Sequence, residues 1–142
     1  MSSHVLIDVS VERAWELIED ADRWPEWADV CVAVSDAPGR GGWRVGHEFG
    51  FRLRMPGRIV PFNVVVSRFE TGKLIEWKST KFSITAVRTI SVESADSGCR
   101  VTDSKHFSSR LLPIRLAYPR WMIRRMTESW LSDLKRESES LN

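Results

Sequence analysis

The N-terminal part of the chain carries two different hydrophobic patterns in succession. Residues 4–9 (HVLIDV) have the composition of a strand, and Ser10 after them is a favoured helix N-cap. The next apolar residues recur at the spacing of one helix face: Val11, Ala14, Trp15 and Ile18. Residues 24–27 (WPEW) follow, and Pro25 suits the first turn of a second short helix. We therefore expect a strand followed by two short helices.

Between residues 30 and 109, apolar and polar residues alternate in short segments, which is typical of half-buried antiparallel strands. The predicted strands cover residues 30–39, 43–55, 57–70, 73–80, 82–94 and 99–109. One face of the strand at 43–55 is expected to point into the core: Val45, His47, Phe49, Phe51, Leu53 and Met55. Thr71 and Gly72 fit a tight hairpin turn, and a second hairpin is expected around residues 96–98.

From residue 118 the hydrophobic period becomes helical. One row along this predicted helix is apolar: Tyr118, Met122, Met126 and Trp130, with Ile123 and Leu134 beside it. A helix over residues 118–139 would be about 30 Å long. A single curved sheet needs its apolar face covered, and this helix is the only predicted element long enough to cover it. The order of elements predicts an α+β fold in one domain, residues 1–142.

Several motifs follow one another along the chain: VSVERAWELIEDADRWPEW at 9–27, WRVGHEF at 43–49, GKLIEW at 72–77 and GCRVTDS at 98–104. Together with the long C-terminal helix, their order resembles the START superfamily, specifically the polyketide cyclase/dehydrase group of SRPBCC proteins. The resemblance implies a helix-grip fold, in which a curved antiparallel sheet of about seven strands wraps around the C-terminal helix, with two short helices after the first strand. It also implies a deep cavity between sheet and helix for a hydrophobic small molecule.

Composition and charge narrow the possible functions. The formal net charge of +2 is too weak to favour nucleic-acid binding. The chain shows no signal peptide and no apolar run of about 20 residues, so we expect a cytoplasmic protein without a membrane-spanning segment. Cys31 and Cys99 lack the paired spacing of a zinc site, so we expect two reduced thiols, no metal and no cofactor. Both a monomer and a homodimer are compatible with the sequence.

Three polar residues interrupt apolar strand faces. Arg88 lies in the middle of a face formed by Phe82, Ile84, Ala86, Ile90 and Val92. Burying an unpaired guanidinium costs several kcal/mol, so Arg88 needs an anion, water or the rim of the sheet. Asp103 shares its parity with Val101 and Phe107 on the neighbouring strand and is a suitable partner. His47 is the third exception. A cavity explains all three; alternatively, Arg88 reaches an edge and His47 is a hydrogen-bonded core residue.

The residues predicted to bind a ligand combine these polar side chains with large apolar ones. They are Trp27, His47, Phe49, Phe51, Trp77, Arg88, His106, Tyr118, Met122 and Met126. In the family that the chain resembles, the two short helices close the cavity, so that Trp24 and Trp27 form its roof. The alternative is that both rings plug the end of the core. The place of His106 depends on the register near residue 105, where a slip of one residue reverses every face.

Two functions of different classes follow from these expectations. The first is non-enzymatic binding of a polyketide-, lipid- or aromatic-like molecule, with Arg88 anchoring a polar or anionic group. The alternative is an enzyme of the aromatase/cyclase or dehydratase type in the same cavity, with His47, Arg88 and Asp103 as catalytic candidates. The sequence contains no phosphate-binding glycine motif, nucleophile elbow or His-Glu-x-x-His motif. A third interpretation, a protein-interaction module, predicts a basic exposed groove and a collapsed cavity.

A basic run near the C-terminal helix contains no acidic residue: Arg110, Arg115, Arg120, Arg124 and Arg125. Such a run usually forms a solvated helix face. The alternative is transient contact with acidic lipid headgroups during delivery of a hydrophobic ligand.

Overall fold

The computed structural model describes residues 1–81, 83–110, 113–114 and 118–140. Within these residues, seven antiparallel strands form one sheet in the spatial order β1-β7-β6-β5-β4-β3-β2. The strands are β1 (Ser2–Ile7), β2 (Cys31–Ser35), β3 (Glu48–Met55), β4 (Arg58–Glu70), β5 (Leu74–Lys81), β6 (Ile84–Ala95) and β7 (Gly98–Ser109). The helices are α1 (Val11–Glu19), a short 3-10 helix (Ala21–Arg23), α2 (Trp24–Trp27) and α4 (Arg120–Glu139). Phe82 and Arg115, which the sequence singled out, lie outside the described residues.

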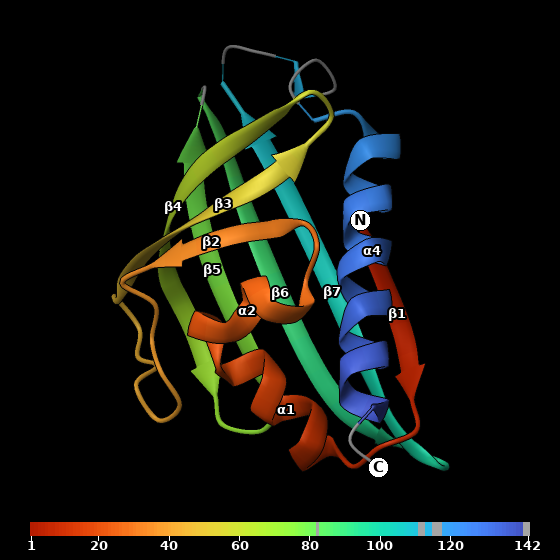
Figure 1. Ribbon diagram of the computed structural model, residues 1–142. Helices are drawn as coiled ribbons and strands as arrows, with labels where there is room; N and C mark the ends of the chain where they lie inside the picture. Colours follow the sequence, from red (N-terminus) through yellow and green to blue (C-terminus); the bar gives the residue numbers. More distant parts are fainter. Residues whose placement is uncertain (82, 111–112, 115–117, 141–142) are drawn as a thin grey trace.

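The long helix α4, blue in Figure 1, lies along the curved sheet beside β7 and β1. Helix α1 packs near the C-terminal end of α4, where Nε of Arg13 donates to the carbonyl of Ser138 at 3.5 Å. The β3–β4 turn and the first residues of α4 lie at the other end of the molecule (Figure 1). This arrangement confirms the predicted helix-grip fold.

The two short helices form where the sequence predicts them. The Oγ atom of Ser10 caps α1 by accepting a hydrogen bond from the backbone N–H of Arg13 at 3.1 Å. The predicted face of α1 is buried through Ala14, Trp15 and Ile18. Pro25 stands in the first turn of α2, where its missing N–H removes no helical hydrogen bond.

The start of β3 differs from the prediction. The strand begins at Glu48 rather than at residue 43, and Val45 is 67% exposed. Gly46 has a φ of 92°, a left-handed conformation that interrupts the alternation of faces. His47 therefore does not continue the inward face, and its Nε2–H donates to the carbonyl of Asp36 at 2.8 Å. The inward face predicted from Phe49 onward is confirmed.

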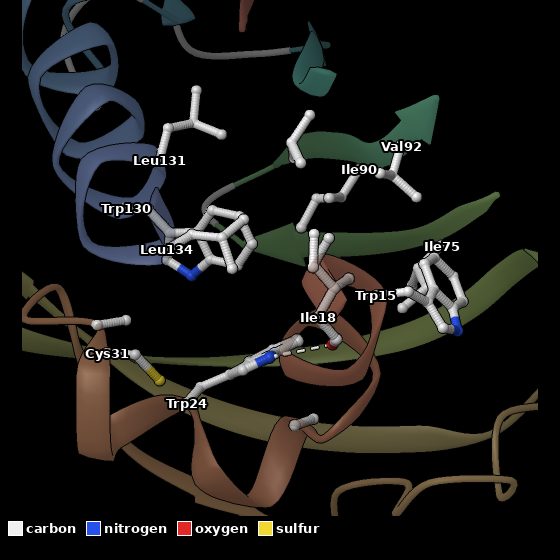
Figure 2. Packing of buried hydrophobic residues seen from close by; sticks show 14 of the residues in the cluster. Trp15, Ile18, Trp24, Cys31, Ile75, Ile90, Val92, Trp130, Leu131 and Leu134 are labelled. Atoms are coloured by element: carbon white, nitrogen blue, oxygen red, sulfur yellow. Dashed lines mark hydrogen bonds between the residues drawn. The ribbon is translucent and has the colours of Figure 1, made fainter. Parts of the chain in front are cut away.

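Buried apolar side chains form two separate clusters. The larger cluster joins α1, α2 and α4 to the sheet (Figure 2). It holds most of the large aromatic residues: Trp15, Trp24, Trp27, Trp43, Phe49, Phe51, Trp77 and Trp130. The smaller cluster lies nearer the start of α4 and consists of Met55, Val60, Ile84, Tyr118, Met122 and Ile123. The apolar row predicted for the C-terminal helix is divided between the two clusters and is buried except for Met126, which is partly buried. The helix begins at Arg120, two residues later than predicted, so Tyr118 precedes it.

Trp24 lies at the centre of the larger cluster. Its side chain is 3% exposed, and its ring centroid is 5.5 Å from that of Trp77 and 6.4 Å from that of Trp130. The indole N–H donates to the carbonyl of Ile18 at 3.1 Å, the contact dashed in Figure 2. Trp27 packs on Trp130 with centroids 5.2 Å apart. Both rings therefore plug this end of the core.

We expect Trp24→Ala to lower the free energy of unfolding by about 3–5 kcal/mol, because it removes a large ring from a filled cluster. Urea unfolding followed by circular dichroism measures the change. Trp121, which is 60% exposed, supplies the matched control. Trp121→Ala should change the same free energy by less than about 0.5 kcal/mol. Equal effects of the two substitutions would contradict this account of the core.

Candidate functional site

A pocket of about 80 Å³ lies between the two apolar clusters. Its walls come from β3 to β7 on one side and from Tyr118 and α4 on the other. The lining residues are Phe51, Leu53, Met55, Phe62, Trp77, Ser79, Ala86, Val87, Arg88, Lys105, Phe107, Tyr118, Ile123 and Met126. The lining is mostly apolar, with Arg88 and Lys105 as its charged members.

The strand register explains why space remains at this place. Ser79 on β5 stands directly opposite Ala86 on β6, and both side chains face inward. The neighbouring pair, Trp77 and Arg88, is far larger. Because these two adjacent side chains are small, they leave unfilled space between the sheet and the residues opposite it, Tyr118 and those of α4.

A charged cluster closes one side of the pocket. Nη2 of Arg88 donates to Oδ2 of Asp103 at 2.6 Å, and Nε donates to Oδ1 at 3.1 Å. Nζ of Lys105 donates to Oδ1 of the same carboxylate at 3.2 Å. The Asp103 side chain has no solvent exposure, and those of Arg88 and Lys105 are mostly buried. The Arg88–Asp103 pair expected from strand parity is therefore present, with a second cation added to it.

Arg88 packs against two aromatic rings. Its guanidinium carbon lies 5.3 Å from the centroid of Trp77 and 5.0 Å from that of Trp130. Cation–π attraction of this kind is strongest where water is excluded. The guanidinium therefore stays buried on the concave face of the sheet and does not extend to the sheet edge.

Lys105 is the charged pocket residue that the sequence analysis did not select. It stands opposite Arg88 across β6 and β7, and its Nζ also donates to Oγ1 of Thr127 on α4. Its parity is that of Asp103 and Phe107, so the alternation of β7 does contain the signal. Lysine at such a position normally reaches solvent, whereas here α4 covers it.

The cluster changes the proton affinities of its members. Burial lowers the pKa of Lys105 to about 8; the carboxylate of Asp103 opposes this effect and the charge of Arg88 adds to it. Burial alone would raise the pKa of Asp103, but the charges and hydrogen bonds of Arg88 and Lys105 outweigh it and lower that pKa. With one carboxylate between two cations, the cluster carries a net positive charge at neutral pH.

The structure brings together about half of the residues that the sequence analysis selected for the ligand site. Those that line the pocket are Phe51, Trp77, Arg88, Tyr118 and Met126. Phe49 and Trp27 lie within the aromatic cluster, and Met122 belongs to the smaller cluster. His47 lies in the loop before β3, and His106 is exposed on the outer face of β7 because Lys105 and Phe107 face inward.

The described residues show no metal-ligand group, no membrane-spanning helix and no reactive thiol. No group of three His, Cys, Asp or Glu side chains there is arranged to hold a metal ion. None of the described helices is both long and apolar enough to cross a membrane. Cys31 and Cys99 are unpaired and buried, and burial raises the pKa of the Cys31 thiol to about 11. A thiol with so high a pKa is a poor nucleophile at neutral pH.

Comparisons with known proteins agree with the observed fold. Residues 1–139 match the family described as "Polyketide cyclase / dehydrase and lipid transport". No curated protein is similar enough in sequence to count as a match. A START superfamily protein from Mycobacterium smegmatis superposes with a TM-score of 0.80 at 14% identity, covering 100% of this chain and 98% of that one.

Two further solved structures have the same architecture. The Zhui aromatase/cyclase from Streptomyces sp. R1128 gives a TM-score of 0.78 at 11% identity, covering 98% of this chain and 92% of that one. Major latex-like protein 151 from Panax ginseng gives 0.79 at 12% identity, with coverages of 98% and 96%. At such low identities, these similarities establish the fold alone.

Removing the shared carboxylate tests the charged cluster. We expect Asp103→Asn to lower the free energy of unfolding by about 3–5 kcal/mol, because two buried cations lose their counter-charge. Glu93→Gln is the matched control, since Glu93 pairs with Arg100 at 3.2 Å on the exposed side of the sheet. That substitution should cost less than about 1 kcal/mol. Similar costs for both variants in urea unfolding would contradict this account, because they would show that the buried cations do not need the Asp103 carboxylate more than an exposed pair needs its own.

Titration of Lys105 provides a second test. Its pKa of about 8 lies below the ordinary value of 10.5, so between these values the unfolded chain binds a proton that the native protein does not. The contribution of Lys105 to stability therefore rises with pH across this window. The free energy of unfolding of the wild type should therefore increase relative to that of Lys105→Met between about pH 8 and pH 10.5. Direct titration of the Lys105 Cε resonance by NMR checks the pKa, and a midpoint at the ordinary value would contradict it.

Proposed function

Because the chain belongs to the polyketide cyclase/dehydrase and lipid transport family, we propose that it binds a hydrophobic small molecule in the pocket between the sheet and α4. One observation carries this proposal: an apolar pocket ends at a buried cluster with net positive charge. Apolar walls with a few convergent polar groups are typical of small-molecule sites. The larger aromatic cluster is filled by the protein's own side chains, so the pocket is the space left for a guest between the sheet and α4.

The charged cluster defines the polar group of the ligand. An ammonium group has three N–H donors, and among the described residues Lys105 uses them on two partners, Asp103 and Thr127. A ligand oxygen in the pocket takes the remaining donor. A carboxylate, an enolate or a polarised carbonyl oxygen suits a net positive site, whereas an amine does not. The ligand is therefore an apolar molecule with an acidic or carbonyl oxygen at one end.

The size of the pocket limits how much of the ligand it encloses. Its volume of about 80 Å³ is well below the roughly 300 Å³ at which drug-sized sites begin. Met55 and Met126 form part of the wall, and methionine side chains adapt readily to different shapes. We propose that the ligand's oxygen-bearing end enters the pocket and that its apolar remainder passes between these two methionines.

An enzymatic function in the same pocket is the second candidate. The observation that favours it is the pKa of Lys105, which at about 8 suits proton transfer near neutral pH. Arg88 and Lys105 would stabilise an enolate, and Asp103 would keep both cations in position. His47, in its loop outside the pocket, takes no part in this version. The two candidates differ in the fate of the ligand: a carrier returns it unchanged, and an enzyme releases a product.

Filling the pocket tests the proposed site. We expect Ala86→Leu to weaken binding of anilinonaphthalene sulfonate, an apolar anion, by about tenfold or more, because the added methyl groups occupy the space over Ser79. Ser91→Leu makes a comparable enlargement on the outer face of the same strand and should leave binding unchanged. Fluorescence titration measures both. If both variants bind the dye as the wild type does, the dye lies elsewhere and the pocket is not the site.

Replacing the cation tests the polar end. Lys105→Met should weaken binding of the anionic dye by about tenfold, in line with the loss of one charge-assisted hydrogen bond. Binding of the uncharged analogue anilinonaphthalene should change far less. Wild-type affinity for the anion should also decrease as the pH rises through about 8, where Lys105 loses its proton. An anion affinity independent of both changes would remove Lys105 from the site.

A further inference from the structure

An exposed tryptophan lies among arginines at the end of the molecule where α4 begins. Trp121 is the second residue of α4 and is 60% exposed. Three exposed arginines share this part of the helix: Arg120, Arg124 and Arg125. Together with Arg54 and Arg58 they form what we call the Trp121 patch.

The β3–β4 hairpin brings Arg54 and Arg58 to the same end of the molecule as the start of α4, although the register places them on opposite faces of the hairpin. Arg54 and Pro56 line one groove together with Trp121 and Arg125. Arg58, the first residue of β4, is close enough to Tyr118 for its charge to oppose the rise in the tyrosine pKa that burial causes. Figure 1 shows the β3–β4 turn and the first turn of α4 at the same end of the molecule. Three separate parts of the chain therefore supply the patch.

The positive charge of the patch is largely uncompensated. Of the ion pairs in the described part of the chain, one involves the patch, with Nε of Arg54 4.0 Å from Oδ1 of Asp29. Both of these side chains are more than half exposed, so their attraction is weak. An exposed indole and a group of exposed, mutually repelling guanidinium groups do not stabilise the isolated protein. Their combination indicates a partner that is both acidic and able to accommodate an aromatic ring.

We propose that the Trp121 patch docks on the surface of a lipid bilayer rich in anionic headgroups. Indole rings favour the boundary between headgroups and acyl chains. Guanidinium groups bind phosphate oxygens through two parallel hydrogen bonds, and each contributes to adsorption on an anionic surface. The groove beside Trp121 also shares Met55 and Met126 with the pocket wall, so the docked face lies next to the pocket. The proposal does not depend on what the pocket binds.

The test is co-sedimentation of the full chain with vesicles. Vesicles of equal parts phosphatidylcholine and phosphatidylglycerol should bind the protein, while phosphatidylcholine alone should not, and added salt should weaken the binding. Arg124→Gln with Arg125→Gln should reduce the affinity by about thirtyfold, at about 1 kcal/mol for each arginine. Trp121→Ala should reduce it severalfold. Since these side chains are exposed, the variants should keep the wild-type circular dichroism spectrum.

The matched control removes the same amount of charge from the other end of the molecule. Arg44 and Lys73 are exposed, and they lie in the loop before β3 and in the β4–β5 turn. Arg44→Gln with Lys73→Gln should bind vesicles as the wild type does, which shows that the patch acts and not the net charge. Ala86→Leu, which fills the pocket, should also bind vesicles normally, so failure of the pocket and failure of the patch give different results.

Three outcomes would overturn the proposal. Absence of binding to phosphatidylglycerol vesicles is the first, and an equal loss in the control double variant is the second. The third is a different acidic partner: competition by free glycerol phosphate would indicate a small phosphate site, and binding to polyglutamate or single-stranded DNA in place of vesicles would indicate a protein or nucleic-acid partner.

Discussion

Inside the curve of the sheet, the carboxylate of Asp103 binds Arg88 and Lys105 without any contact with solvent. Burying any one of these charges alone would cost several kcal/mol. Together the three charges compensate one another, and their contacts link two strands of the sheet to α4. Arg88 lies between Trp77 on β5 and Trp130 on α4, while Lys105 reaches Thr127 on α4. The position of the long helix on the sheet and the position of the charged cluster are therefore determined together.

The pocket follows from the same constraint. On one side of the cluster, aromatic rings from both short helices fill the space completely enough that Trp24 is almost inaccessible to water. On the other side, the pair Ser79 and Ala86 leaves room under Tyr118 and Met126. The cluster stands at the boundary between filled and open space. A ligand that entered the pocket would therefore meet apolar walls and one cationic end, a combination that suits an apolar molecule with an acidic or carbonyl oxygen.

Charge is distributed unevenly along the long helix. The patch of arginines around Trp121 lies at its N-terminal end, where residues 118–127 contain no Asp or Glu. The opposite end packs near α1, a region whose acidic residues include Glu12, Glu16 and Asp20. A formal net charge of +2 conceals this polarity. Because long-range electrostatic forces orient a protein before contact, the pocket end would face an acidic surface first.

Local pattern was enough to predict much of this architecture. The helix cap at Ser10, the inward face from Phe49 to Met55 and the buried row of α4 depend on spacings within one element, which tertiary contacts left unchanged. The pairing of Arg88 with Asp103 was also accessible, because parity on adjacent strands places both on one face. The expectation for His47 failed at Gly46, whose positive φ ends the alternation on which it rested.

The tertiary structure alone decided those properties that depend on several elements at once. Whether Lys105 reaches solvent depends on the path of α4 across β7. Whether Ser79 and Ala86 leave a pocket depends on the register between β5 and β6 and on the height of the helix above them. Trp121 and Trp130 belong to the same helix and have the same chemistry, yet one is exposed among arginines and the other is buried against Arg88. The sequence alone determined the order and faces of the elements, because periodicity is local; the distances between those faces, and hence the space available to a ligand, arose only when the elements packed together.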